Sequence, residues 1–353
     1  MEDALSRSNS RCLQNAFSKL SEEASELYLP SEIPRVPVPA SPLEFYREYV
    51  APNKPVIFTN SVDHWPALTR WSNEYLAEVL ADCEVTVDVT PTGYGDAIVG
   101  DRFVTPDIRK MPFTHFLQAL SDHSSFNGIP YIQHQNGNFS KDFSKLWRDI
   151  EEDIEWVTEA LGMPPDVVNF WMGDDRSVSS LHKDHYENLY VVIAGEKLFT
   201  LYPPTDMYFL PEKKNLRVAS YRERTTTAST TNNSSPHHSS FDIIDSDPPT
   251  FVPWIAVDPF PVNDEEREKQ ERLYPRFKKA TPFHVRLRPG EMLYLPSLWY
   301  HHVRQRADEH GRVIAVNFWY DMQYDVKYNY FKFMEALIND DEAEEKEEAE
   351  HSI

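Results

Sequence analysis

The sequence predicts a mainly β protein with flanking helices, built around a jelly roll or a related barrel. One observation is a series of short runs after residue 130 that are rich in β-branched and aromatic residues and bounded by glycine, proline or polar turns. These runs are YIQHQ, VVNFWMG, NLYVVIAG, KLFTLYPP, PFHVRLRPG, EMLYLP and VIAVNFWYD. The other is composition, because 353 residues that are 41% apolar and 13% aromatic can bury a large core.

The first third of the chain predicts helices and a strand in front of this barrel. Apolar residues recur at three- and four-residue steps over residues 16–29, which predicts an amphipathic helix. A proline-rich stretch ends it, a helix is expected to begin after Ser41, and KPVIFTN is typical of a strand. We therefore expect a helical arm at 1–40 and an α/β extension at 41–129 that packs on the barrel.

The barrel domain is expected at 130–331, with one interruption. Residues 217–249 are rich in serine, threonine and asparagine, which predicts a disordered surface insertion. His237 and His238 lie in this segment, and we expect them to face solvent rather than to bind a metal.

The chain after the last predicted strand favours a helix. Apolar residues repeat along one face over 324–338, and this face either packs on its own barrel or forms a homodimer interface. The pattern favours neither reading. Residues 332–353 hold the end of the helix and an acidic tail, which we expect to be solvated and disordered.

The net charge of the chain limits the classes of partner that it can bind. The formal net charge is -22 at pH 7. Such a surface repels phosphate backbones and anionic lipids, which argues against direct nucleic-acid binding and against a membrane partner. A basic protein segment would be attracted instead.

Cysteine usage and hydropathy indicate the compartment. Cys12 and Cys83 are too few for a disulfide framework and are typical of a reducing environment. The first residues lack the apolar run of a signal peptide, and no segment approaches the roughly 20 apolar residues of a membrane span. We expect a cytoplasmic or nuclear protein, or one found in both places.

Two tripeptides are candidate metal ligands. Non-haem iron oxygenases hold iron with two histidines and one carboxylate, and leave the other side of the metal open. Residues two apart on a strand share a face, so His-x-Asp or His-x-Glu can supply two of the ligands. The sequence contains His182-Lys183-Asp184 and His185-Tyr186-Glu187, and chance alone predicts about two such tripeptides. Neither is convincing without its context.

The context favours the first tripeptide. Asn188 continues the face of His182 and Asp184 if the strand runs on in phase. Lys197 opens the next strand, where its ammonium can pair with a carboxylate of an acidic cosubstrate.

Further downstream, the chain supplies a third histidine. His301 and His302 follow a strand and a proline, at the expected mouth of the barrel. Asn317 lies on a strand among apolar neighbours, which indicates an inward polar contact.

At this point the residues carry a family resemblance. SSLHKDHYENLYVVIAGEKLFTLYPP, followed by GEMLYLPSLWYHHV and AVNFWYD, resembles the JmjC hydroxylases over nearly the whole chain. HWPA, TPTGYGDAIVGDRF and VNFWYDMQYDVKYNYF are similar to the lysyl hydroxylases of that family, and more distantly to its asparaginyl hydroxylases. The resemblance implies a cupin-like double-stranded β-helix that is an iron(II)- and 2-oxoglutarate-dependent dioxygenase, using O2 as cosubstrate.

The resemblance also implies roles for particular residues. The iron ligands would be His182, Asp184 and His301. Lys197 would bind the distal carboxylate of 2-oxoglutarate, in a pocket completed by Tyr131, Ser179, Asn188 and Asn317. Ser179 stands where relatives often have threonine, which preserves the hydroxyl. His185 and His302 are expected to pack or support, and Tyr131 and Trp319 could otherwise be plain core aromatics.

The implied activity is protein lysyl 3-hydroxylation, acting on GTPases of the developmentally regulated GTP-binding type. Asp96 and Asp101 lie in a glycine-rich loop that could place a carboxylate near a substrate ammonium. Two alternatives use the same features. One is an enzyme acting on histone tails, as a demethylase or as an endopeptidase at methylated arginine or lysine. The other is a non-catalytic jelly-roll interaction module with a structural metal.

Overall fold

Two facing, mostly antiparallel sheets form the centre of the protein. The computed structural model describes residues 2–224 and 240–351. The first sheet has the strand order β1 (Arg35–Pro37), β2 (Val56–Thr59), β17 (Met292–Leu295), β11 (Tyr186–Ala194), β19 (Val313–Asp321) and β9 (Val167–Gly173). The second has the order β16 (Phe283–Leu287), β12 (Glu196–Tyr202), β18 (Tyr300–Arg306), β10 (Val178–Lys183) and β4 (Tyr94–Gly95). The predicted jelly roll is confirmed.

Burial along the strands explains this arrangement. β16 is an edge strand of strict alternation, in which Phe283, Val285 and Leu287 are buried and the residues between them are exposed. β11 is instead buried at every position from Glu187 to Ile193, because both of its faces are covered. Its inner face contacts the second sheet.

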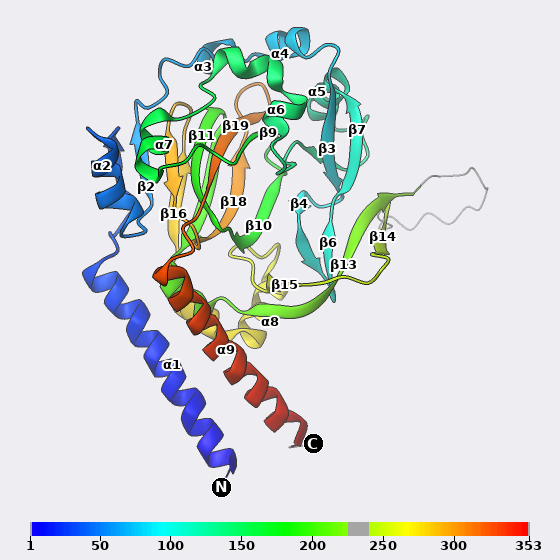
Figure 1. Cartoon of the computed structure of the whole chain (residues 1–353). Helices are drawn as coiled ribbons and strands as arrows, with labels where there is room; N and C mark the ends of the chain where they lie inside the picture. Colours follow the sequence, from blue (N-terminus) through cyan, green and yellow to red (C-terminus); the bar gives the residue numbers. More distant parts are fainter. Residues whose placement is uncertain (1, 225–239, 352–353) are drawn as a thin grey trace, which may run out of the picture.

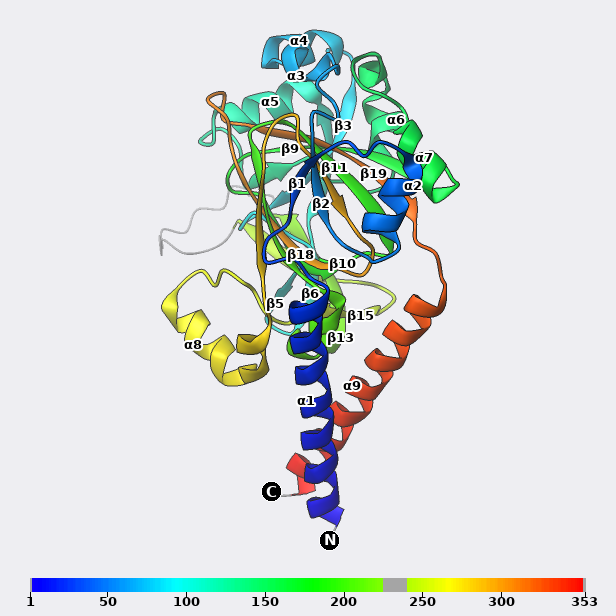
Figure 2. The same cartoon turned by 90° about the vertical axis from the view of Figure 1, so that its left-hand side faces the viewer.

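Helices cover the outer face of the first sheet, and Figures 1 and 2 show α3 to α6 toward the top of the molecule and α7 at its side. Phe170 of β9 and Val316 of β19 share one buried cluster with Trp71, Phe116 and Phe139 from this helical layer. The helices are α1 (Glu2–Leu27), α2 (Pro42–Phe45), α3 (Ala67–Arg70), α4 (Asn73–Val79), α5 (Phe113–Ser121), α6 (Asn138–Asp142), α7 (Glu155–Leu161), α8 (Asp264–Leu273) and α9 (Val326–His351). Shorter helical turns are η1 (Tyr46–Val50), η2 (Ser144–Asp149), η3 (Pro204–Phe209) and η4 (Pro275–Lys279).

The helix and the strand predicted around residues 41–60 are present. A helix begins after Ser41, whose hydroxyl accepts a hydrogen bond from the Glu44 amide, and KPVIFTN contains β2. β2 pairs with β17 and β4 pairs with β10, so the extension adds strands to both sheets of the barrel. Three further strands, β3 (Glu84–Thr90), β7 (Asp107–Pro112) and β8 (Ile129–Tyr131), form a sheet of their own.

The predicted disordered insertion at 217–249 is wrong for its two ends. β13 (Glu212–Glu223) and β14 (Phe241–Asp245) pair with each other, and β13 also pairs with β15 (Phe251–Ile255) and β6 (Arg102–Thr105), which pairs with β5 (Ala97–Val99). Ala219, Tyr221 and Phe241 are buried, and this sparse apolar pattern was hidden by the polar composition around it. His237 and His238 lie outside the described residues.

Helices α1 and α9 extend from the barrel in the same direction, with both termini at their far ends (Figure 1). Phe17 of α1, Phe331 of α9 and Tyr208 of η3 belong to one buried cluster. α9 continues to His351, across residues expected to be a disordered tail. Within the part of the chain that the structure describes, no helix is long and apolar enough to cross a membrane.

Candidate metal and cosubstrate site

Two neighbouring strands of the second sheet bring three predicted ligands together. His182 on β10 and His301 on β18 are direct cross-strand partners, and Asp184 follows the end of β10. The Leu298 amide donates to the Asp184 carbonyl, which fixes this turn. The ligand atoms of the three side chains all lie within 4.8 Å of one another.

Hydrogen bonds orient both imidazole rings. Nδ1 of His182 is 2.6 Å from the Ser180 carbonyl, and Nδ1 of His301 is 3.1 Å from the Trp299 carbonyl. A carbonyl only accepts, so each Nδ1 carries the proton and each Nε2 presents its lone pair. Burial, with the nearby His182, lowers the pKa of His301 to about 4 and keeps that ring neutral.

The three side chains fit a divalent metal ion. The Nε2 atoms of His182 and His301 lie 3.8 and 3.6 Å from Oδ2 of Asp184. This oxygen is buried and has no hydrogen-bond partner among the described residues, which is costly for a carboxylate unless a cation neutralises it. Two imidazoles and one carboxylate are a donor set suited to non-haem iron(II).

The overlapping tripeptide is engaged elsewhere. Glu187 is buried in the first sheet and accepts hydrogen bonds from the Tyr294 hydroxyl at 2.6 Å and the Ser297 hydroxyl at 2.8 Å. His185 is exposed and its ring packs against Tyr328 of α9. Neither belongs to the group of possible metal ligands.

His302 points away from this site. The side chain is fully buried, and within the described chain neither ring nitrogen has a hydrogen-bond partner. Its neighbours are Tyr94, Phe260 and Asp258, whose Oδ1 lies 3.6 Å from Nε2. Successive side chains of a strand point to opposite faces, so His302 lies on the face opposite His301.

A pocket between the two sheets contains the three side chains together with other predicted residues. Ser179, Asn188 and Asn317 line it. The prediction that Asn188 continues the strand of His182 and Asp184 is wrong. β10 ends at Lys183, and Asn188 lies on β11 of the facing sheet, from which it enters the pocket. The remaining lining residues are Gln135, Trp171, Tyr190, Phe199, Val303 and Trp319.

Two asparagines and a tryptophan fix one wall of the pocket. The Trp171 indole donates to Oδ1 of Asn317 at 2.8 Å, and Nδ2 of Asn317 donates to Oδ1 of Asn188 at 3.1 Å. These bonds hold both amides in place before any ligand binds.

Lys197 lies behind Trp171 and Tyr190, which line the pocket, and is 1% exposed. Its ammonium donates to the Tyr131 hydroxyl at 2.7 Å and to Oε1 of Gln305, and it lies over the rings of Tyr131, Trp171 and Tyr190. No described carboxylate pairs with it, and burial lowers the pKa of Lys197 to about 7. The predicted neighbours Tyr131 and Lys197 are therefore in contact, next to two residues that line the pocket.

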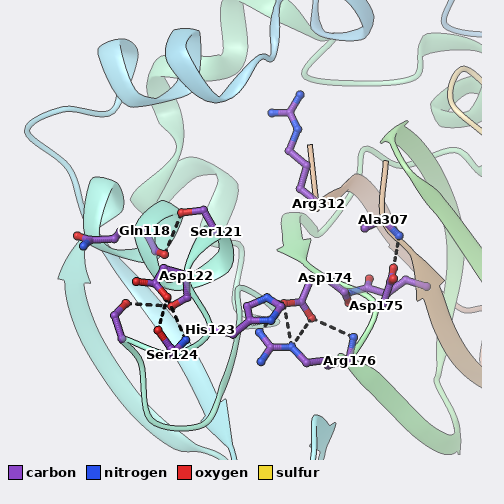
Figure 3. Close-up of polar contacts among 12 residues, drawn as sticks. Gln118, Ser121, Asp122, His123, Ser124, Asp174, Asp175, Arg176, Ala307 and Arg312 are labelled. Atoms are coloured by element: carbon purple, nitrogen blue, oxygen red, sulfur yellow. Dashed lines mark hydrogen bonds and ion pairs between the residues drawn. The ribbon is translucent and has the colours of Figure 1, made fainter. Parts of the chain in front are cut away.

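Gln305 is a site residue that the sequence analysis missed. It pairs with Lys197 across the strands, and its Nε2 donates to the Asp174 carbonyl at 2.6 Å. Figure 3 shows the Asp174 carboxylate held between Arg176 and His123, at 2.5 and 3.3 Å. Gln305 shares the phase of His301 on β18, and this alternation was the available signal.

Glycine is required beside this anchor. A Cβ on Gly173 would lie 2.6 Å from the Tyr131 ring and 2.9 Å from Nε2 of Gln305. Any larger residue would displace the groups that hold Lys197.

Trp254 is the second residue that was missed. Its ring lies nearly parallel to that of His182, with centroids 5.9 Å apart, and its indole donates to the Ser180 hydroxyl at 3.0 Å. It lies on β15, just beyond the segment that we expected to be disordered, and no local pattern marked it.

Comparison with known proteins agrees with this geometry. The family described as cupin-like domain matches residues 42–326. The chain is 42% identical over 314 residues to the human "Bifunctional peptidase and (3S)-lysyl hydroxylase JMJD7", covering 89% of this chain and 92% of that protein. It is 41% identical to the "Lysine-specific demethylase JMJ32" of Arabidopsis thaliana, covering 91% of each chain. It is 39% identical to the "JmjC domain-containing protein E" of Dictyostelium discoideum, covering 90% of this chain and 92% of that one. The chain therefore belongs to the cupin-like family of JmjC-domain proteins.

Proposed function

We propose that this protein is an iron(II)- and 2-oxoglutarate-dependent protein hydroxylase that acts on lysine side chains. The observation that carries the proposal is made on the described residues. A carboxylate oxygen without a hydrogen bond lies between two imidazoles, near a buried ammonium that no carboxylate pairs with. A cation fits the first feature and an anion fits the second. A metal-chelating dicarboxylic acid such as 2-oxoglutarate satisfies both at once.

In this proposal the metal is held by His182, Asp184 and His301. The distal carboxylate of 2-oxoglutarate meets Lys197 and Tyr131, and Ser179, Asn188 and Asn317 complete the pocket. When bound, iron(II) with 2-oxoglutarate and O2 supplies the oxidising power for hydroxylating a C–H bond, with succinate and carbon dioxide as the other products.

The chain itself orients the reactants and keeps water away. Trp171, Tyr190, Phe199 and Val303 give the pocket apolar walls. Such walls strengthen the contact between Lys197 and an anion, and they limit side reactions.

The proposed substrate is a lysine in a GTPase of the developmentally regulated GTP-binding type, hydroxylated at carbon 3. Similarity to a human protein named as a (3S)-lysyl hydroxylase supports the lysine, and the acidic surface favours a basic segment.

We expect a peptide with a central lysine from such a GTPase to gain one oxygen atom on that side chain without release of formaldehyde. Replacing the lysine by arginine should greatly reduce turnover, since a planar guanidinium differs in shape from an ammonium and shifts the methylenes. Mass spectrometry of the peptide and a formaldehyde assay measure both. Equal modification of the arginine peptide would contradict the proposal.

A second candidate is action on histone tails, because relatives are named as a lysine-specific demethylase and as a peptidase. Formaldehyde release from methylated tails, or a cut peptide, would favour it. A non-catalytic interaction module would instead show no 2-oxoglutarate turnover under any condition.

We also propose that the protein forms a homodimer through α9. Tyr324, just before α9, and Val326, Tyr330 and Phe333 on α9 have side chains that are 57–64% exposed, whereas Phe331 of α9 is buried. Changing Tyr330 and Phe333 together to glutamate should yield monomers in sedimentation experiments, since charge opposes burial of this face. Lys327→Glu, a charge change on the same helix, serves as the control. A monomeric wild-type protein would contradict the proposal.

A further inference from the structure

A short loop places Asp96 beside the candidate metal ligands. β4 runs parallel to β10, with Gly95 opposite Ser179, and the Ser180 hydroxyl donates to the Asp96 carbonyl at 2.6 Å. Asp96 has a φ of 52°, a conformation that aspartate and asparagine adopt more readily than most residues. Among the described residues, its carboxylate makes no hydrogen bond and no ion pair, although the side chain is largely covered.

Asp88 on β3 brings a second carboxylate into the same region. It is 6% exposed, and its buried Oδ1 has no hydrogen-bond partner in the described chain. Burial, together with the charge of Asp88, raises the pKa of Asp96 to about 6. β3, which carries Asp88, contacts β4, and Asp96 directly follows β4, so the two carboxylates lie on neighbouring elements.

The basic groups near Asp88 and Asp96 do not balance the charge of both carboxylates. Nδ1 of His134 lies 3.6 Å from Oδ1 of Asp88, and Asp88 raises the pKa of that histidine. His182, the other basic group acting on Asp96, presents its lone pair toward Asp184. A protonated His134 balances at most one of the two carboxylates, so the space favours one further positive charge.

An aromatic side chain contacts both the candidate metal ligand His182 and Ser180, whose hydroxyl binds the Asp96 backbone. Trp254 stacks on His182 and contacts Phe103, with ring centroids 4.6 Å apart in the second pair. Its indole bonds to Ser180, the residue that fixes Asp96. Trp254 is partly exposed, so solvent reaches part of this side chain.

We propose that Asp96 and Asp88 form a subsite for the ammonium group of a substrate lysine, whose methylene chain lies along Trp254 toward His182. Asp101, the other carboxylate predicted for this role, is not part of the subsite, since its side chain is 85% exposed and pairs with Arg102. Two underpaired carboxylates, one buried and one partly buried, stabilise an ammonium, and an indole suits the methylenes and the adjoining positive charge. The lysine rests on the proposed function, whereas binding of the cation does not require turnover.

The test measures binding rather than reaction. The full chain, loaded with Mn(II) and 2-oxoglutarate without O2, is immobilised and exposed to a pooled peptide library with a fixed central lysine, and to the same library with norleucine there. Mass spectrometry of the retained peptides gives the lysine preference. We expect a preference of about tenfold or more for the wild type, since norleucine lacks the charged group that would form hydrogen bonds with the two carboxylates.

Asp96→Asn should reduce this preference to nearly one, because asparagine keeps the backbone conformation and removes the charge. Asp88→Asn should lower it as well, and Asp101→Asn, a matched change nearby, should leave it intact. Mn(II) affinity verifies that each variant is folded. A wild type without preference, or folded Asp96→Asn and Asp88→Asn proteins that retain it, would overturn the subsite. Lysine peptides that are retained selectively yet gain no oxygen under turnover conditions would support the subsite and refute the proposed hydroxylation.

Discussion

Asp184→Ala is expected to abolish succinate production from 2-oxoglutarate. The change removes the only carboxylate among the three converging side chains, and Oδ2 of Asp184 is the atom that faces both Nε2 atoms. The loss should exceed about a hundredfold, because even residues that merely support metal ligands cost about 10- to 100-fold. Succinate is measured by mass spectrometry, and metal affinity by titration with Mn(II).

Glu187→Gln is the matched control, because this glutamate belongs to the overlapping tripeptide. Its carboxylate is bound by Tyr294 and Ser297 inside the first sheet, so the amide retains the volume and an acceptor oxygen. We expect a less stable protein with normal Mn(II) affinity and turnover. If Glu187→Gln loses the metal while Asp184→Ala keeps it, the choice between the two tripeptides is wrong.

The barrel strands could be predicted because their burial pattern is local. Strict alternation marks β16, and the continuous apolar run of β11 marks a strand covered on both faces. The pairing of His182 with His301, in contrast, does not follow from any local pattern. It joins residues far apart in sequence, and only the motif resemblance predicted it before the register of β10 and β18 was known.

The parts that could not be predicted depend on contacts across the fold. The sequence of β13 is largely polar and gives no clear strand signal. Pairing with β14, β15 and β6 stabilises this strand, and the local sequence does not specify those partners. The pairing of β13 with β15 positions Trp254 at the site. Asn188 lines the pocket as predicted, but from a different strand. A turn after Asp184 moves the chain to the facing sheet before β11 begins.

Lys197→Ala is expected to raise the apparent KM for 2-oxoglutarate about tenfold or more. A hydrogen bond to a charged group contributes about 1.5–3 kcal/mol, and each 1.4 kcal/mol is a factor of about ten in affinity. Steady-state assays at varied 2-oxoglutarate concentration measure the change. Lys145→Ala is the control, because it removes a lysine that pairs with Asp82 on the surface. An unchanged KM in Lys197→Ala would place the anchor elsewhere.

The pH dependence of binding separates a charged anchor from a merely structural lysine. The pKa of Lys197 is lowered to about 7 in the empty pocket, and a bound carboxylate must raise it, since an anion stabilises the protonated form. Above pH 7 the empty pocket holds the neutral amine, so binding takes up a proton. The affinity for 2-oxoglutarate should therefore be highest below pH 7 and fall by up to about tenfold per pH unit above it, until the pKa of the complex is reached. Calorimetry of the Mn(II)-loaded protein at pH 8, in two buffers of different ionisation enthalpy, counts the protons directly. Wild type and Lys145→Ala should take up close to one proton, whereas Lys197→Ala should take up fewer, and equal uptake in all three proteins would contradict the assignment.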